Sequence, residues 1–473
     1  MDQVSDQVAS QIHTLVNDEG FLGTANNDHL HQIGGLLKGL SPAQADQVLS
    51  KLGSADLQKW ANEVNSGGVL GAQGLTQGEK KDLFNLFARD LDGAQLARVS
   101  TAFGDRGDVI LLGQSVAQNA TPHTKLQYIQ QLAGQTTGKG FDIQNGLLSQ
   151  TVFYSNAQAV AVGTVLASLK GNAQAIDQVV GSLTDTQLRA VLQGAETQTS
   201  TIYPGNDSPP LIQTDGKPLQ AILSAVATSK DPATKARVFE AGVQALTDIQ
   251  DTNQPTSPNI GAASDAKLVE QGLTDILNSD TTGVVHALRL GQHGGQALTT
   301  YMKEMFTEDP SGSNKTIGTM IARLQQSNHL NQNPLDYIDR LVSDGHGQKV
   351  FSNARDLGYF SGAMQAGIAK IISDAKTQGD VLNNIFTTAV SLGTGWKIPD
   401  PAAVPLKMGA TVVNAGIREV IREVVASVAS GHKKLADALF DLSVPHAANG
   451  KAAELGADPA FDGARAEVIL QNM

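Results

Sequence analysis

The stretch LDGAQLARVSTAF, Leu91 to Phe103, carries the pattern that decides the fold of this 473-residue chain. Its larger apolar residues recur at steps of five, three and four, a spacing that gathers them on one face of an α-helix. Two more stretches have the same shape: LTDTQLRAVLQGA, Leu183 to Ala195, and LGSADLQKWANEV, Leu52 to Val64. The alternation expected of half-buried strands is scarce. The sequence therefore predicts an all-α protein.

A second recurring pattern is a helix start with a lysine four places after its capping residue. It occurs as TQGEK (76–80), TPHTK (121–125) and DPATK (231–235). The leading Thr or Asp can accept hydrogen bonds from the free N–H groups of the first helical turn. Pro122 and Pro232 fit the first helical position, where no N–H is needed. Glu79 completes a capping box with Thr76.

Together the two patterns predict antiparallel helical hairpins in which the leucine stretch comes first and the capped helix follows a loop. The second leucine and the lysine are 23, 29 and 47 residues apart for Leu57–Lys80, Leu96–Lys125 and Leu188–Lys235. We expect loop insertions to explain these differences, because longer loops add little entropic cost. The longest copy contains a Pro-rich loop at 199–218.

Two architectures are compatible with this pattern in the N-terminal half. The first is an α-solenoid-like repeat, in which stacked hairpins bury faces that no single hairpin could bury. The second is a helical bundle without duplication, because every helical protein reuses caps and leucine spacing. A helical bundle follows in the C-terminal half under either reading.

The pattern divides the chain into four parts. Residues 1–250 form the N-terminal hairpin region, 251–265 a polar linker, 266–445 the C-terminal bundle and 446–473 a loose tail. The bundle is expected to contain helices at Leu268–Leu277, Val284–Leu290, Gln296–Phe306, Thr316–Gln326 and, as one helix or two, Asn353–Leu392. Within the last of these, Gly358, Gly362 and Ala366 recur every four residues, so a neighbouring helix can approach closely along that row.

Composition argues against several functional classes. Hydrophobic residues make up 41% of the chain but aromatic residues only 4%, which favours an aliphatic core of closely packed helices. A net charge of −12, with no Lys/Arg cluster longer than a pair, argues against nucleic-acid binding. The chain has no cysteine, which excludes disulfides, thiolate metal sites and cysteine nucleophiles. We also expect no classical signal peptide and no transmembrane helix.

Several motifs with chemical associations are interpreted as structural. AGQTTGKGFD (Ala133–Asp142) has one residue too few for a phosphate loop and lacks its hydroxyl, so a glycine-terminated helix end is expected. His29 and His31 would point apart on a helix capped by Asn26 or Asn27, which argues against joint metal ligation. His286 and His293 are separated by a glycine-rich helix end.

Three more motifs receive the same interpretation. SDGHGQK (Ser343–Lys349) is read as an interhelical turn, because residues adjacent in sequence do not form a catalytic triad. GDRGDV (Gly104–Val109) contains the Arg-Gly-Asp tripeptide of adhesion ligands, but Asp105 or Asp108 also suits a helix cap. Asp90 and Asp92 are read as solvated surface acids. The sequence therefore predicts no catalytic, cofactor-binding or metal-ligating residue.

Membrane contact has one candidate segment, residues 385–417. The apolar stretches Ile385–Gly395 and Ala402–Ile417 are short for spanning a bilayer and are interrupted by charged residues. A buried core hairpin is the favoured interpretation, and bilayer insertion after a conformational change is the alternative.

The tract LGYFSGAMQAGIAKIISDAKTQGDVLNNIFTTAV (Leu357–Val390), followed by ALFDLSVP (Ala438–Pro445), resembles the tail of cysteine-free, all-helical secreted proteins of plant- and soil-associated Gram-negative bacteria. These include effectors, translocation helpers and toxin-accessory regions. The resemblance implies secretion without a classical signal peptide, although bacterial cytoplasm is the other location considered. It transfers no catalytic residue and no cofactor.

The leading functional hypothesis is a non-enzymatic protein-interaction module that presents a groove to a partner helix or peptide. The second is a translocator or pore-type protein that uses the 385–417 hairpin, and the third is an enzyme with a dispersed site. A protein partner is expected, whereas nucleic acid and a small-molecule ligand are not.

Overall fold

The computed structural model describes residues 3–18, 27–65, 75–103, 107–134, 141–145, 150–154, 157–195, 197–202, 211–251, 259–260, 262–308, 316–317, 319–320, 323–324, 341–343, 349–351, 354–374 and 459–472. Over these residues the chain is predominantly helical, which confirms the predicted fold class. It forms two compact units. Unit 1 comprises Met1–Thr234 with Gln244–Leu273, and unit 2 comprises Lys235–Val243 with Thr274–Met473.

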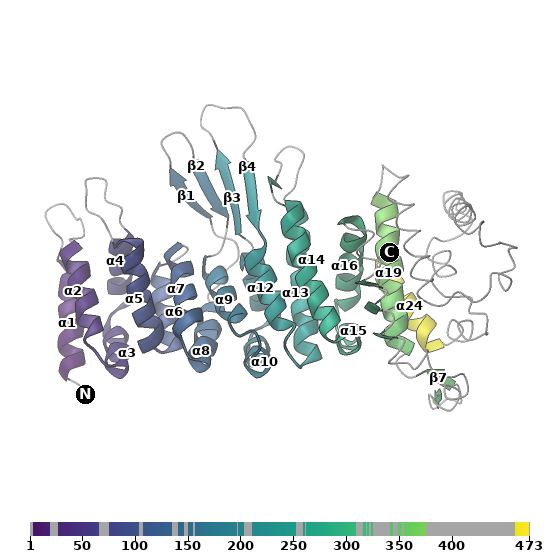
Figure 1. The fold of residues 1–473 in the computed structure, drawn as a ribbon, viewed down its shortest axis with the longest axis horizontal. Helices are drawn as coiled ribbons and strands as arrows, with labels where there is room; N and C mark the ends of the chain where they lie inside the picture. The colour runs from purple at the N-terminus through teal and green to yellow at the C-terminus, as the bar shows by residue number, and fades with distance from the viewer. Residues whose placement is uncertain are drawn as a thin grey trace, which may run out of the picture. The chain divides into compact units, whose positions relative to one another are not determined.

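Unit 1 is built from a long series of helices (Figure 1). They are α1 (Gln3–Asn17), α2 (Asn27–Lys38), α3 (Pro42–Lys51), α4 (Ser54–Asn65), α5 (Gln77–Asp90), α6 (Gly93–Phe103), α7 (Gly107–Asn119), α8 (Pro122–Ala133), α9 (Ala157–Ala167), α10 (Ala173–Ser182), α11 (Asp185–Ala195) and α12 (Lys217–Val226). Helices α13 (Pro232–Asp251) and α14 (Ala262–Ser279) contribute residues to both units.

The helices of unit 1 pack mainly against the next helix but one. Contacts join α1 to α3, α3 to α5, α5 to α7 and α7 to α9 in one series, and α4 to α6, α6 to α8, α8 to α10 and α10 to α12 in the other. Each inner helix of a series thereby packs against two others, as stacked helical units do. The predicted hairpins pair each helix with its neighbour in sequence, whereas most of the packing joins alternate helices. Duplication itself stays a prediction.

Each leucine stretch is the junction between two helices. Its first leucine ends the preceding helix: the backbone N–H of Leu91, for example, donates to the carbonyl of Phe87 at 2.9 Å. The corresponding positions Leu52 and Leu183 end α3 and α10, and all three side chains are at most 5% exposed. The second leucine, as in Leu96, lies buried on the next helix. The apolar spacing therefore reflects a tight connection between two helices, in which the leucine at the end of the first helix and the leucine within the second are both buried in the core.

The predicted order is found in the first copy, where the helix of the Leu52–Val64 stretch, α4, is followed by α5 with its Thr76 cap, but not in the other two. The interval from Leu96 to Lys125 contains the whole of α7, and the interval from Leu188 to Lys235 contains two strands and α12, so these intervals are not loop insertions. The predicted caps themselves are confirmed, because Thr76, Thr121 and Asp231 each accept hydrogen bonds from first-turn N–H groups.

Helix α9 lies at the centre of unit 1 and is apolar on every side. It packs against α7, α8, α11 and α12. Its sequence, AQAVAVGTVLA, carries no charged residue, and eight of its positions are buried. Gly113 of α7 approaches it so closely that a Cβ there would lie 2.7 Å from the Cα of Ala161. Small residues thus let the backbones of α7 and α9 approach each other.

A five-stranded sheet projects from unit 1 and was not predicted (Figure 1). Its strands are β1 (Phe141–Asn145), β2 (Gln150–Tyr154), β3 (Thr197–Ile202), β4 (Leu211–Asp215) and β5 (Asn259–Ile260). They pair in chain order, antiparallel except for the parallel pair β4–β5. The stretch predicted as a Pro-rich loop at 199–218 therefore contains most of β3, the whole of β4 and the start of α12. The connections between α8 and α9 and between α11 and α12 thus contain paired strands.

Unit 2 contains helices α15 (Thr281–Leu290), α16 (Gly294–Glu308), α19 (Ala354–Asp374) and α24 (Pro459–Asn472), and the paired strands β6 (Leu341–Ser343) and β7 (Lys349–Phe351). Helix α19 packs against both α16 and α24. The described part of the predicted loose tail, 459–472, is thus a packed helix, which corrects that expectation. The predicted small-residue row is confirmed at Gly362, where a Cβ would lie 2.6 Å from the backbone oxygen of Arg465.

Most of the expected C-terminal helices are present. Helices α14, α15 and α16 cover the segments predicted at 268–277, 284–290 and 296–306, and the described residues of 316–326 are helical. Of 353–392, the structure describes α19. The segment 385–417, interpreted as a buried core hairpin with bilayer insertion as the alternative, lies outside the described residues.

Candidate functional site

A half-open cleft of about 420 Å³ lies between α2 and α5 of unit 1. Its apolar lining comes from Leu30 of α2 and from Leu75, Leu83 and Leu86 in or beside α5. Leu30 and Leu83 are buried, so they form a fixed part of the cleft rather than a mobile surface. Its size falls within the range of known binding pockets. We refer to this feature as the α2–α5 cleft.

Charged side chains surround the apolar lining of the cleft. They are His31 and Lys38 of α2, with Glu79, Asp82 and Arg89 of α5. His31 Nε2 lies 3.1 Å from Glu79 Oε1, a contact that joins the two helices near their starts. The cleft therefore combines an apolar interior with a polar rim, which is how grooves that receive amphipathic segments are built.

Glu79 is held in place by the cap of its own helix. Its carboxylate accepts hydrogen bonds from the backbone N–H and the hydroxyl of Thr76, at 2.8 and 2.7 Å. These two bonds, followed by the charge of His31, lower the pKa of Glu79 despite a small opposing effect of desolvation. The capping box predicted from sequence thus fixes an ionised carboxylate at one end of the cleft.

Of the two adjacent glycines in α2, Gly34 lines the α2–α5 cleft and Gly35 does not. A Cβ at either position would meet no atom within 4 Å, so close packing requires neither glycine. Each glycine in a helix interior lowers stability by roughly 1 kcal/mol relative to alanine. Any side chain at position 34 would occupy the space that the cleft now provides.

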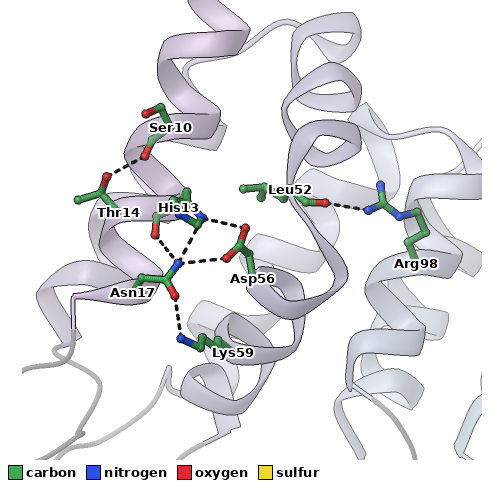
Figure 2. Close-up of polar contacts among 8 residues, drawn as sticks. All are labelled: Ser10, His13, Thr14, Asn17, Leu52, Asp56, Lys59 and Arg98. Carbon is green, nitrogen blue, oxygen red and sulfur yellow. Dashed lines mark hydrogen bonds and ion pairs between the residues drawn. The ribbon is translucent and has the colours of Figure 1, made fainter.

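A polar network joins α1 to α4 on another part of unit 1 (Figure 2). Asp56 of α4 accepts from Asn17 Nδ2 at 3.1 Å and lies 2.9 Å from His13 Nδ1, and Asn17 in turn accepts from Lys59. Burial raises the pKa of the Asp56 carboxyl, but the hydrogen bonds from His13 and Asn17 outweigh it, so the pKa falls below its ordinary value of 3.8. These side chains satisfy one another and fasten two helices together.

Arg98 of α6 completes this region by binding the end of α3 (Figure 2). Its guanidinium donates to the carbonyl oxygen of Leu52 at 2.9 Å, which Figure 2 shows, and to that of Leu49 at 3.0 Å. Backbone carbonyls at a helix C-terminus lack intrahelical partners, and a cation there also complements the helix dipole. The role of Arg98 is therefore structural.

The pKa of Asp46 in α3 is shifted in the opposite direction from that of Asp56. Its pKa is raised, because burial and the charge of Asp92 outweigh the hydrogen bond that it accepts from the Asp92 backbone N–H. For Asp56, whose folded pKa is depressed, stability is present above the unfolded pKa and lost as pH falls through the folded pKa. For Asp46 the ionised form is unfavourable at neutral pH, and acidification through its raised pKa relieves the cost.

We therefore expect the same substitution to have opposite effects at the two positions. At pH 7, Asp56→Asn should lower the free energy of unfolding by about 1–2 kcal/mol, whereas Asp46→Asn should leave it unchanged or raise it slightly. Urea unfolding can be followed by the fluorescence of buried Trp60 in a Trp396→Phe background, which leaves one of the two tryptophans. The Asp56→Asn deficit should shrink below pH 3.8. A deficit that is constant with pH would contradict this account.

The predicted histidine motifs occupy separate environments. His31 contacts Glu79, and His29 lies 3.8 Å from Asp18, so the two imidazoles of α2 reach different acids. Helix α15 ends at its Gly291 cap, between His286 and His293, as expected. Within the described residues, no group of three or more potential ligands is placed to hold a metal ion.

The Arg-Gly-Asp tripeptide does not present its acid to solvent. Asp108 is buried and forms an ion pair with Lys80 of α5, at 3.0 Å. Asp90 pairs with Arg89, and Asp92 accepts from the N–H of Gln95. These acids are therefore bound by local partners, and Asp90, whose side chain is 15% exposed, is not the solvated surface acid that was expected.

Two further motifs are located in part. Gly134 ends α8, as expected for the glycine-rich stretch 133–142, and β1 begins at Phe141. The stretch 343–349 joins β6 to β7 and is therefore not an interhelical turn. Its central residues lie outside the described residues.

A buried carboxylate that sequence reasoning missed lies in unit 2. Asp356 of α19 is 1% exposed and accepts from Arg289 Nε at 2.7 Å, and His286 Nδ1 lies 3.1 Å from its other oxygen. The imidazole is half exposed, so the arrangement resembles an acid–base dyad in outline. The guanidinium neutralises the carboxylate, however, and all three groups join α15 to α19. We interpret this cluster as a structural anchor.

The α2–α5 cleft could hardly be foreseen from the sequence. Its two sides are at least 37 positions apart along the chain, and the only local sign is the Gly34-Gly35 pair inside a helical pattern. Over the described residues, no helix has the length and apolar character needed to cross a bilayer. The chain matches no protein-family model, and no curated protein matches it in sequence. What this site does must therefore be argued from its geometry.

Proposed function

We propose that this chain is a non-enzymatic protein-interaction module, in which the α2–α5 cleft receives an apolar side chain of a helical segment from a protein partner. The observation that carries the proposal is the cleft itself, which has buried leucines inside and charged residues at its rim. Helix-binding grooves combine these features, because apolar anchors supply affinity and the rim supplies specificity.

The surroundings of the cleft support this use. Leu30 and Leu83 are fixed in the core, and Glu79 is fixed by its capping box, so the cleft is formed before any partner arrives. A preformed site loses little conformational entropy on binding. The other polar clusters of unit 1, around Asp56 and Asp108, are occupied by internal partners and have evident structural roles.

The two glycines of α2 provide the test. Helical peptides selected on the full chain from a displayed library should bind Gly34→Leu at least about tenfold more weakly, because the new side chain fills the cleft. Gly35→Leu changes the same helix by the same atoms, but outside the cleft, and should bind within about twofold of the wild type. Fluorescence anisotropy with synthetic copies of the selected peptides measures both. If all selected peptides bind Gly34→Leu normally, the cleft is not the binding site.

We further propose that the protein acts as a secreted effector or secretion helper of a Gram-negative bacterium. The absence of cysteine and the resemblance of 357–390 to such proteins support this role. A reporter fusion should leave a bacterial host only when the host carries an intact secretion apparatus. Equal export after deletion of that apparatus would contradict the proposal.

A further inference from the structure

We infer that the segment bound by the α2–α5 cleft is an amphipathic helix with a basic end and an acidic end. This inference rests on the proposed function and adds the chemistry of the partner. It comes from the distribution of charge along the cleft.

The two helices that form the cleft run in the same direction along it. His31, near the start of α2, contacts Glu79 in the first turn of α5. Lys38 and Arg89, from the last turns of the same two helices, line the same cleft. At 1.5 Å per residue, Lys38 lies about 10 Å beyond His31, and Arg89 about 15 Å beyond Glu79.

Charge is therefore separated along the cleft. One end carries the carboxylates of Glu79 and Asp82, and the other carries the cations of Lys38 and Arg89, of which Arg89 also pairs with the neighbouring Asp90 carboxylate. The Glu79 carboxylate is ionised at neutral pH, and its hydrogen bonds from Thr76 lower its pKa further. Leu83 and Leu86 lie between these ends along α5, whereas Leu30 and Leu75 precede His31 and Glu79 at the acidic end. An occupant must consequently place a positive group near Glu79, apolar side chains in the middle and a negative group near Lys38.

A helix of about two to three turns spans this length. Its apolar residues, three or four positions apart, would face the leucines, and its charged residues would flank them. An occupant with the same charge at both ends would meet repulsion at one end of the cleft. Charge arrangement thus selects among partners that share the same apolar anchors.

The test uses the displayed helical library on the full chain. Selection on the wild type should enrich peptides that carry Lys or Arg at one end and Asp or Glu at the other. Selection on Lys38→Glu/Arg89→Glu should enrich peptides that are basic at both ends. A synthetic peptide from the first selection should bind the double variant about tenfold more weakly, and high salt should reduce that difference.

Lys81→Glu is the matched control, because Lys81 is an exposed residue of α5 that does not line the cleft. It should leave the enriched charge pattern unchanged. Circular dichroism and thermal unfolding establish that each variant is folded. If the peptides from the two selections are sensitive to Gly34→Leu but share one charge pattern, the inference about charge is wrong and the proposed function stands. If no peptide is sensitive to Gly34→Leu, the proposed function itself fails.

Discussion

Replacing Lys80 by methionine is expected to lower the free energy of unfolding of unit 1 by about 3–5 kcal/mol. The lysine ammonium lies 3.0 Å from Asp108 Oδ2, and the two side chains are only 8% and 6% exposed. Removing the cation leaves a carboxylate in the core with a strong desolvation cost. Asp108→Leu should cause a loss of the same order, because it leaves the ammonium uncompensated.

The double variant Lys80→Met/Asp108→Leu distinguishes this mechanism from a simple loss of packing. Replacing a whole buried ion pair by apolar residues is often neutral, so most of the stability should return. Urea unfolding followed by Trp60 is suitable, because this side chain packs on Phe87 of α5 with ring centres 5.8 Å apart. Additive losses in the double variant would show that the pair is not what stabilises the contact between α5 and α7.

Gly93→Ala is expected to have a second large effect, a loss of about 2–3 kcal/mol or more. A Cβ at this position would lie 2.4 Å from Gln127 Cβ and 2.5 Å from the Tyr128 backbone nitrogen of α8. Since atoms of a helix backbone cannot yield as a flexible side chain does, α6 and α8 would have to separate.

Gly107→Ala is the control for this substitution. Both glycines are the first residue of their helix, but a Cβ at Gly107 would meet no atom within 4 Å. Alanine there should be neutral or stabilising by up to about 1 kcal/mol, because it restricts the unfolded chain. The same unfolding assay compares them. Similar losses for the two variants would mean that the close approach of α6 and α8 does not limit residue size.

Local physics made part of this fold predictable. Helix caps depend on neighbouring residues, so Thr76, Thr121 and Asp231 could be identified directly, and the row containing Gly362 correctly indicated a close helix contact. The order of the helical units was not predictable in this way. Leu91 and Leu96 have the same apolar spacing whether they start a hairpin or join two helices, and the choice depends on packing between distant segments.

The strands and the cleft were missed for related reasons. Strands such as β3 (TQTSTI) lack the apolar alternation that marks a half-buried strand, and they depend on pairing with segments far along the chain. The cleft depends on which faces of α2 and α5 meet. The sequence correctly predicted that Lys80 lies in the first turn of a helix. It could not predict that Lys80 is buried, because this depends on its ion pair with Asp108, 28 residues later.

Helix α9, which is uncharged and largely apolar, has a consequence for how the protein is made. A chain emerges from the ribosome N-terminus first, so α7 and α8 are available to α9 as soon as it appears, whereas α11 and α12 are not yet synthesised. Until Ala195 and Ile222, which lie beside Gly163 of α9, have been synthesised, one apolar face of α9 is exposed to solvent. During synthesis the nascent chain therefore exposes an aliphatic surface on α9. Chaperones that bind such surfaces compete for it with α11 and α12, which are synthesised later.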